Sequence, residues 1–141
     1  MSLRANTSLV LDVVRGVERR ILNYFMDLLI LLTLYCCGGQ ISGYDVIKYL
    51  QLKYHFLPSP GTVYSCLYDM ERKGLLRGKQ NGRKRIYALT QQGAETAKAI
   101  LNGRDRILNF MSMILQKNGS KAPLQLLPST PFSSMESHAE P

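Results

Sequence analysis

The sequence contains no tryptophan, only three cysteines and two histidines, and 10 acidic residues against 18 basic ones. The odd number of cysteines (Cys36, Cys37 and Cys66) and the lack of a Cys-x-x-Cys pair exclude a disulfide framework and the usual zinc-ribbon and thioredoxin-like motifs. His55 and His138 are too few for a histidine-rich metal site, and the acidic residues have no metal-ligand spacing. We therefore expect no metal, no cofactor and a reducing, cytoplasmic location.

A long hydrophobic run is also missing. The most apolar stretch, residues 28–37, is about half as long as a membrane-spanning helix, and the first 20 residues mix charges with valines instead of forming a signal peptide. We expect no targeting segment, no transmembrane helix and no membrane partner. The apolar stretch should be a core helix that buries Cys36 and Cys37 as inert thiols. Since no glycine-rich phosphate loop and no plausible nucleophile–base set is present, the sequence does not predict an enzyme or any catalytic residue.

The length and charge of the chain favour a small domain with a polyanionic partner. The 141 residues suffice for one hydrophobic core, and the net charge of +8 points to nucleic acid or an acidic membrane surface. Residues 118–141 hold four of the six prolines and five serines, so we expect a flexible tail there.

Hydrophobic periodicity and turn signals predict a mostly α chain with a small β-hairpin (α+β). The expected elements are helices over residues 7–22, 23–37, 42–55 and 60–73, strands over 75–79 and 83–89 around a turn at 80–82, and a helix over 91–117. Ser42 and Thr90 can cap the third and last helices, and Gly74 ends the fourth. Two short helices followed by a hairpin are the outline of a winged helix-turn-helix.

The helix over residues 60–73 has two distinct faces. At about 100° per residue, its apolar side chains fall together and should face the core: Val63, Cys66, Leu67 and Met70. The opposite side carries Gly61, Ser65, Tyr68 and Arg72, with Thr62 and Asp69 beside them and Tyr64 at the border. A helix that enters the major groove needs small residues first and hydrogen-bonding side chains next, although an ordinary polar helix face has a similar composition.

The hairpin that follows is strongly cationic. Residues 72–85 hold seven basic residues and no acidic one: Arg72, Lys73, Arg77, Lys79, Arg83, Lys84 and Arg85. A turn with Asn81 and Gly82 at its tip would project these cations toward phosphates and is narrow enough for a minor groove. Strand alternation assigns Tyr87 and Leu89, near the base of the hairpin, to the core.

Residues 27–93 resemble the PadR-type transcriptional regulators. The resemblance rests on the stretches SGYDVIKYL, PSPGTVYSCLYDMERKGLL and GRKRIYALTQQG, with Tyr87, Leu89, Thr90 and Gly93 closing the wing. It implies a winged helix-turn-helix domain with residues 60–73 as the recognition helix and 80–85 as the wing. It also implies a homodimer built by the last helix, often with help from the N-terminal one. Family members act mostly as repressors that small molecules or other signals release.

The resemblance and the residue patterns together predict a sequence-specific, double-stranded-DNA-binding transcriptional regulator, a repressor that acts as a homodimer. Residues 1–22 and 91–117 would be dimerisation helices, 23–90 the DNA-binding domain and 118–141 a disordered tail. The expected DNA contacts are Tyr44, Lys48, Ser59, Thr62, Tyr64, Ser65, Tyr68, Arg72, Lys79, Asn81, Arg83, Lys84 and Arg85. The expected dimer contacts form apolar stripes too long to be left exposed: Val10, Val13, Val17, Ile21, Ile100, Ile107, Met111 and Ile114.

Two questions stay open at this point. The chain departs from some family members in lacking tryptophan, so a ligand pocket built on a dimer-interface tryptophan is not available, and the small-molecule effector is unknown. Winged helices also serve as protein-interaction modules without DNA binding, and the fold alone does not decide between the two. The seven cations beside the exposed helix face favour DNA.

Overall fold

The computed structural model describes residues 2–116, and it divides the chain after Gly103 into two compact units that are treated separately below. The helices are α1 (Ser2–Tyr24), α2 (Met26–Cys37), α3 (Gly43–Tyr54), α4 (Pro60–Arg72), α5 (Gln91–Asn102) and α6 (Arg104–Leu115). The strands are β1 (Gln40–Ser42), β2 (Leu76–Asn81) and β3 (Lys84–Leu89). The predicted tail over residues 118–141 lies outside the described residues.

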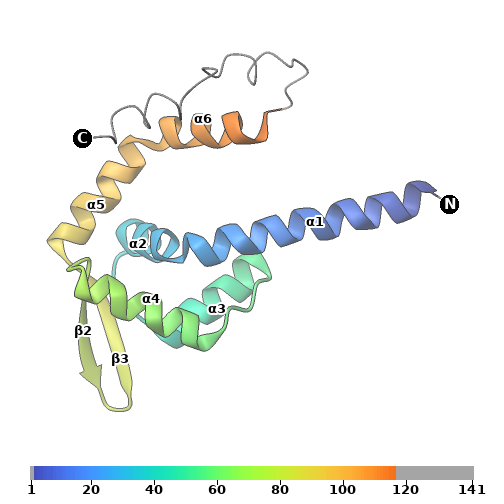
Figure 1. Cartoon of the computed structure of the whole chain (residues 1–141). Coiled ribbons are helices and arrows are strands. Elements are labelled where there is room, and N and C mark those ends of the chain that lie inside the picture. The colour runs from blue at the N-terminus through green and yellow to red at the C-terminus, as the bar shows by residue number, and fades with distance from the viewer. Residues whose placement is uncertain (1, 117–141) are drawn as a thin grey trace, which may run out of the picture. The chain divides into compact units, whose positions relative to one another are not determined.

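The core of the first unit is built around α2 (Figure 1). This helix is apolar on all sides, and it packs against α1, α4, α5 and β3. Met26, Ile30, Leu31 and Leu34 are its buried residues. Among the described residues, no single helix is long and apolar enough to cross a membrane, and only α1 with α2, bent by 68°, reaches that length and composition as a pair. The predicted central core helix is confirmed.

Side-chain caps fix where two helices begin, as the sequence predicts. At the start of α3, the Ser42 hydroxyl accepts a hydrogen bond from the Asp45 N–H (3.2 Å), and the Asp45 carboxylate accepts one from the Ser42 N–H (2.8 Å). At the start of α5, the Thr90 hydroxyl accepts from the Gly93 N–H (3.0 Å) and donates to the Gly74 carbonyl (2.6 Å). The second cap also ties α5 to the turn that follows α4.

The sheet has three antiparallel strands in the order β1-β3-β2. Strand β1 was not predicted, because three residues are too few to display the alternation of a strand. Gly38 and Gly39 both adopt positive φ (69° and 86°) and turn the chain so that Ile41 pairs with Tyr87. The strand matters for the site because its last residue, Ser42, is also the cap of α3.

The hairpin turn lies one position later than predicted. Asn81 pairs with Lys84, so Gly82 and Arg83 form the two-residue loop, and Asn81 ends β2 rather than forming the tip. Gly82 alone has positive φ (62°), and two-residue turns that need positive φ at their first central position favour glycine there. Arg83 therefore occupies the tip itself.

The predicted single helix over residues 91–117 is wrong. It is two helices, α5 and α6, separated at Gly103, whose N–H still bonds to the carbonyls of Ala99 (3.0 Å) and Ile100 (3.1 Å) before the helix stops. Glycine has a low helix propensity, and the apolar stripe continues on both sides of the break, so periodicity alone gave no sign of it. Ile100 belongs to the first unit, and Ile107, Met111 and Ile114 belong to the second.

The expectation that Cys36 and Cys37 are buried is also wrong. Both are exposed, because they occupy the last turn of α2 beyond Leu34, its last buried residue. The apolar run in the sequence is longer than the part of the helix that the core covers.

Gly93 provides a test of the packing between α5 and the hairpin base. A Cβ at this position would meet the backbone carbonyl of Leu75 and the side chain of Leu89, which lies 2.8 Å away. We expect Gly93→Ala to destabilise the protein by about 1–3 kcal/mol through overpacking. In Gly16→Ala, where no atom lies within 4 Å, the change should stabilise by about 0.5–1 kcal/mol. Urea unfolding followed by circular dichroism measures both, and equal midpoints would contradict this packing.

Candidate nucleic-acid interface

The polar face of α4 is turned outward because the opposite face is completely buried. Val63 and Leu67 are 0% exposed and Met70 is 2% exposed, and all three pack in the core between α2, α3 and β2. The residues on the other side are exposed: Gly61, Thr62, Ser65, Tyr68 and Arg72. Pro60 occupies the first turn and Ser59 precedes it with extended backbone, so two hydroxyl side chains, those of Ser59 and Thr62, lie at the helix N-terminus. The predicted division of this helix into a core face and an outer face is confirmed.

Arg72 is already engaged on this face. Its guanidinium lies 5.7 Å from the centroid of the Tyr68 ring and 3.9 Å from a carboxylate oxygen of Asp69. Both partners are neighbours on the same helix, and all three side chains are exposed, so these contacts orient the arginine without withdrawing it from solvent.

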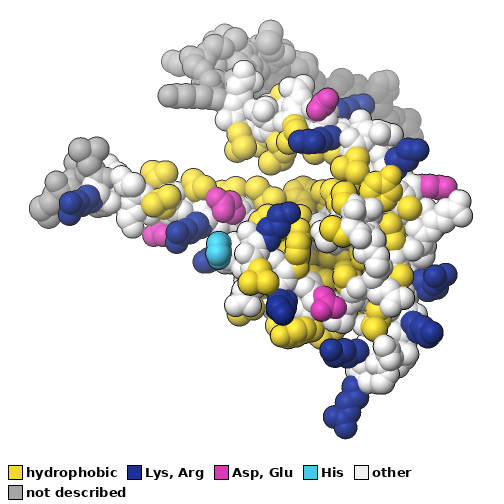
Figure 2. Space-filling view, turned by 180° about the vertical axis from the view of Figure 1, so that it is seen from behind, with side chains coloured by type: hydrophobic (Ala, Val, Ile, Leu, Met, Phe, Trp, Pro, Cys, Tyr) yellow, Lys and Arg dark blue, Asp and Glu magenta, His cyan; other side chains and the backbone are white. Residues whose placement is uncertain are grey.

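The hairpin projects beside α4 and carries its cations toward its free end (Figure 1). Lys79, Arg83 and Lys84 are exposed, and Figure 2 shows the Lys and Arg side chains gathered along this part of the molecule. Lys79 and Lys84 share one face of the two-stranded ribbon, while Arg83 lies in the turn. The predicted positions of Tyr87 and Leu89 are confirmed, since Tyr87 is 5% exposed and Leu89 packs against the core.

An ion pair holds the hairpin against the end of α4. The Arg85 guanidinium donates to both Glu71 oxygens, at 2.8 Å to Oε1 and 2.6 Å to Oε2, and the Gly78 N–H donates to Oε2 at 3.2 Å. A Cβ at Gly78 would overlap this pair, which explains why glycine occupies that point of β2. The Arg85 hydrogen bond, ahead of its charge, holds the pKa of Glu71 below its usual value. Glu71 thus positions the cationic hairpin relative to the polar helix face.

The sequence analysis missed Glu71. The available signal was its place, since it is the acidic residue immediately before the run of seven cations. Arg85, which was predicted as a DNA contact, lies in this clamp with its side chain 43% exposed. Lys79, Arg83 and Lys84 carry no such ion pair among the described residues.

The N-terminus of α3 reaches the same surface. Gly43 is buried beneath the ring of Tyr64, and a Cβ at Gly43 would overlap that ring. This contact aligns Tyr64 of α4 beside Tyr44, which is 60% exposed. Both tyrosines line a groove of about 670 Å³ whose other wall is formed by the hairpin residues Gln80, Arg83, Lys84 and Arg85. Lys48, one turn along α3, is exposed.

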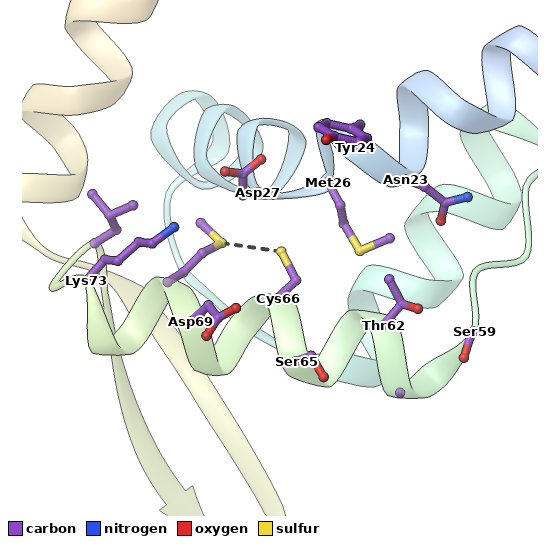
Figure 3. Close-up of a pocket in the computed structure, with 13 residues that line it drawn as sticks. Asn23, Tyr24, Met26, Asp27, Ser59, Thr62, Ser65, Cys66, Asp69 and Lys73 are labelled. Atoms are coloured by element: carbon purple, nitrogen blue, oxygen red, sulfur yellow. Dashed lines mark hydrogen bonds between the residues drawn. The ribbon is translucent and has the colours of Figure 1, made fainter. Parts of the chain in front are cut away.

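The other flank of α4 has the opposite charge. A second groove, of about 630 Å³, separates α4 from the junction of α1 and α2, and Figure 3 shows Asp27 on one wall and Asp69 on the other. Burial, helped by these two carboxylates, raises the pKa of the Cys66 thiol in this groove to about 11, so the thiol is protonated and unreactive at neutral pH. The surface is therefore polarised across α4, with carboxylates on the α2 side and cations on the hairpin side.

The predicted dimer contacts are uncovered apolar side chains. On α1, Val10 and Val13 are each 58% exposed, whereas the opposite face of the helix supplies Arg15, Arg19 and Leu22 to a pocket shared with the end of α3. In the second unit, described by itself, α6 has no buried residue, and Ile107 and Ile114 are 46% and 61% exposed. Val17, Ile100 and Met111 are half-buried, and Ile21 is 37% exposed. Within residues 2–116 no group of three or more His, Cys, Asp or Glu side chains could hold a metal ion.

The clamp predicts a pH-dependent stability. Because the folded-state pKa of Glu71 lies below the ordinary value of 4.5, its contribution is complete above pH 4.5 and is lost as the pH falls through the folded-state value. Glu71→Gln should lower the urea midpoint of unfolding at neutral pH, and the difference from wild type should vanish in strong acid. Asp69→Gln, whose carboxylate makes only the long exposed contact to Arg72, should have little effect at either pH. A difference for Glu71→Gln that persists in strong acid would exclude this ionic origin.

Comparison with known proteins supports the same assignment. Residues 31–99 match the family model described as the Transcriptional regulator PadR-like family. The structure is similar to a PadR family transcriptional regulator from Eggerthella lenta, with a TM-score of 0.58 and 21% identity over 82% of this chain and 99% of that chain. It is also similar to a PadR family transcription regulator from Clostridium difficile, with a TM-score of 0.55 and 26% identity over 64% of this chain and 98% of that chain.

No curated protein matches the chain. The family match nevertheless includes α3, α4 and the hairpin, which together form the surface described above. The solved PadR structures share the helix order and the winged helix-turn-helix fold. Over residues 31–99, the chain therefore belongs to the transcriptional regulator PadR-like family.

Proposed function

We propose that this protein binds specific sequences of double-stranded DNA as a homodimer and acts in transcription as a repressor. The observation that carries the proposal is the exposure of the polar face of α4 directly beside the cationic end of the hairpin, with the Glu71–Arg85 pair fixing one against the other. A duplex presents base edges in a groove flanked by phosphates, and this surface has the matching order of chemistry.

In the proposed complex, α4 enters the major groove through its N-terminal half. Gly61 and Ser65 are small enough to allow close approach, and the hydroxyls of Ser59, Thr62 and Ser65 contact base edges or phosphates. Tyr64 and Tyr68 follow along the same helix. The carboxylates of Asp27 and Asp69 repel phosphate on one flank, so the duplex backbone is directed to the hairpin flank.

The hairpin supplies the sequence-independent part of the affinity. Lys79, Arg83 and Lys84 bind phosphates, and Arg83 at the tip, next to Asn81, reaches toward the minor groove. The remaining predicted phosphate contacts are Tyr44, Lys48 and Arg72. Arg85 acts mainly through Glu71, by holding the hairpin at the correct distance from α4.

A homodimer accounts for the uncovered apolar faces. The α1 stripe of Val10, Val13, Val17 and Ile21 and the apolar side chains of α6 would each be removed from water by the same faces of a second copy. A two-fold axis through such an interface would place the two α4 helices about 34 Å apart, one helical turn of DNA. A dimer on a palindromic promoter site represses by excluding other proteins from that site, in the cytoplasm, where the exposed Cys36 and Cys37 stay reduced.

Arg83 tests the role of the hairpin. We expect Arg83→Ala to lower the affinity for all duplex sequences alike and to reduce the slope of log affinity against log salt by about one unit at most, because one phosphate contact is lost. Lys98→Ala, which removes one exposed charge on α5, is the matched control and should leave the slope unchanged. Electrophoretic mobility shifts over a salt series measure both. An unchanged slope in Arg83→Ala would show that the hairpin does not contact phosphate.

The same experiment separates DNA binding from a protein-partner function. Wild-type protein should retard random duplex at low salt and retain only its specific site as salt increases. If wild-type protein retards no duplex even at low salt, the winged helix serves a protein partner instead.

Val13 tests the dimer. Placing a carboxylate in the middle of the α1 stripe by Val13→Glu buries a charge in the proposed interface, so the dimer should dissociate at concentrations where wild type remains dimeric. Arg19→Glu puts the same carboxylate on the opposite, charged face of α1 and should leave the dimer intact. Sedimentation equilibrium gives the mass of each variant, and a wild-type monomer, or a dimer unaffected by Val13→Glu, would contradict this interface.

A further inference from the structure

A second cavity lies apart from the DNA-facing grooves, between α2 and α3. Its volume is about 220 Å³, and nearly all of its lining surface is carbon. The lining side chains come from α2 (Met26, Leu29, Ile30 and Thr33) and from β1 and α3 (Ile41, Asp45, Val46, Tyr49 and Leu50). Seen from behind, hydrophobic side chains fill a recess in the first unit that charged side chains border (Figure 2).

The cavity is suited to an apolar molecule rather than to water. An apolar protein cavity of about 150 Å³ stays dry and accepts benzene, and this one is larger. Its polar side chains already have partners, since the Asp45 carboxylate accepts from Ser42 (2.8 Å) and the Tyr49 hydroxyl accepts from Lys53 (2.9 Å). A water molecule would find few free hydrogen-bonding groups there. The Asp45 carboxylate in the wall also disfavours an anionic ligand.

The walls of the cavity are joined to the DNA-facing surface by short contacts. Asp45 is both a wall of the cavity and the residue that caps α3 through Ser42. The next residue, Gly43, carries the ring of Tyr64, which belongs to α4 and to the groove beside the hairpin. A ligand that moves α3 away from α2 would therefore move Tyr44 and Tyr64 relative to Arg83 and the hairpin.

We propose that this cavity is a binding site for an uncharged, apolar small molecule of one or two fused rings, and that its occupancy lowers the affinity of the α3–α4–hairpin surface for DNA. The binding site itself is independent of the proposed function, and the effect on DNA rests on it. A second copy of the chain or one of its own apolar segments is the competing occupant, and the small volume and enclosed apolar lining favour the small molecule.

Indole, which is uncharged and bicyclic, is the probe for the site. In the full chain with labelled Ile, Leu, Val and Met methyl groups, indole should cause saturable shifts at Ile30, Val46 and Leu50 and leave Ala97 and Leu76 unmoved. Indole-3-acetate, its anionic counterpart, should bind at least tenfold more weakly. Shifts confined to other methyl groups, or none up to the solubility limit of indole, would overturn the site. Methyl shifts in this cavity that instead follow protein concentration without indole would assign it to a second copy.

Filling the cavity gives the matched variants. Leu29→Phe places a larger side chain in the cavity and should weaken indole binding at least tenfold, whereas Leu32→Phe, on the same helix and also half-buried but outside the lining, should not. Thr33→Met fills the cavity from its edge and replaces Leu29→Phe if that variant unfolds. Wild-type affinity for indole in both filling variants would overturn the site.

A DNA arm tests the coupling. Saturating indole should weaken wild-type binding to duplex several-fold and have no effect on Leu29→Phe. Indole that fills the cavity without changing DNA affinity would overturn the coupling and leave the site. Absence of DNA binding without indole would instead contradict the proposed function, and the methyl titration would still decide the site.

Discussion

The burial of one face of α4 is the constraint on which the rest of the structure depends. Val63, Leu67 and Met70 are removed from water against α2, α3 and β2, and the hydrophobic free energy of that burial fixes the rotation of the helix. Once that rotation is set, the helical repeat forces Gly61, Ser65 and Tyr68 outward. The polar face is therefore a consequence of core packing, and it needs no polar contact of its own to be presented.

The hairpin requires a different kind of constraint, because a two-stranded ribbon has little core to anchor it. Here the anchor is at its base and along one side. Tyr87 is buried, Thr90 bonds to the turn after α4, and Glu71 holds Arg85 and Gly78. The tip beyond these contacts keeps its cations free. A rigid base with a charged, solvated end is suited to a polyanion, since the geometry is preset and each phosphate contact costs little ordering.

The placement of α3 links the interior of the domain to this surface. Its N-terminus touches α4 through Gly43 and Tyr64, while its apolar face forms one wall of the cavity against α2. A packed core transmits displacement because its elements cannot deform independently. The site for a small molecule and the site for DNA are thus two surfaces of the same helix.

Local patterns in the sequence determined most of the elements and the sign of the surface charge. Capping residues, glycine stops and the 3.6-residue period located α2, α3 and α4, and the run of seven cations marked the hairpin, because these signals act within one or two turns of chain. The family resemblance added the identity of α4 as the recognition helix. Only the tertiary structure revealed β1, the break at Gly103, the exposure of Cys36 and Cys37, the Glu71–Arg85 pair and the cavity between α2 and α3. Apart from the break at Gly103, a local stop that the continuing apolar pattern concealed, each of these depends on the packing of elements distant in the chain or on where that packing ends, which no local pattern encodes.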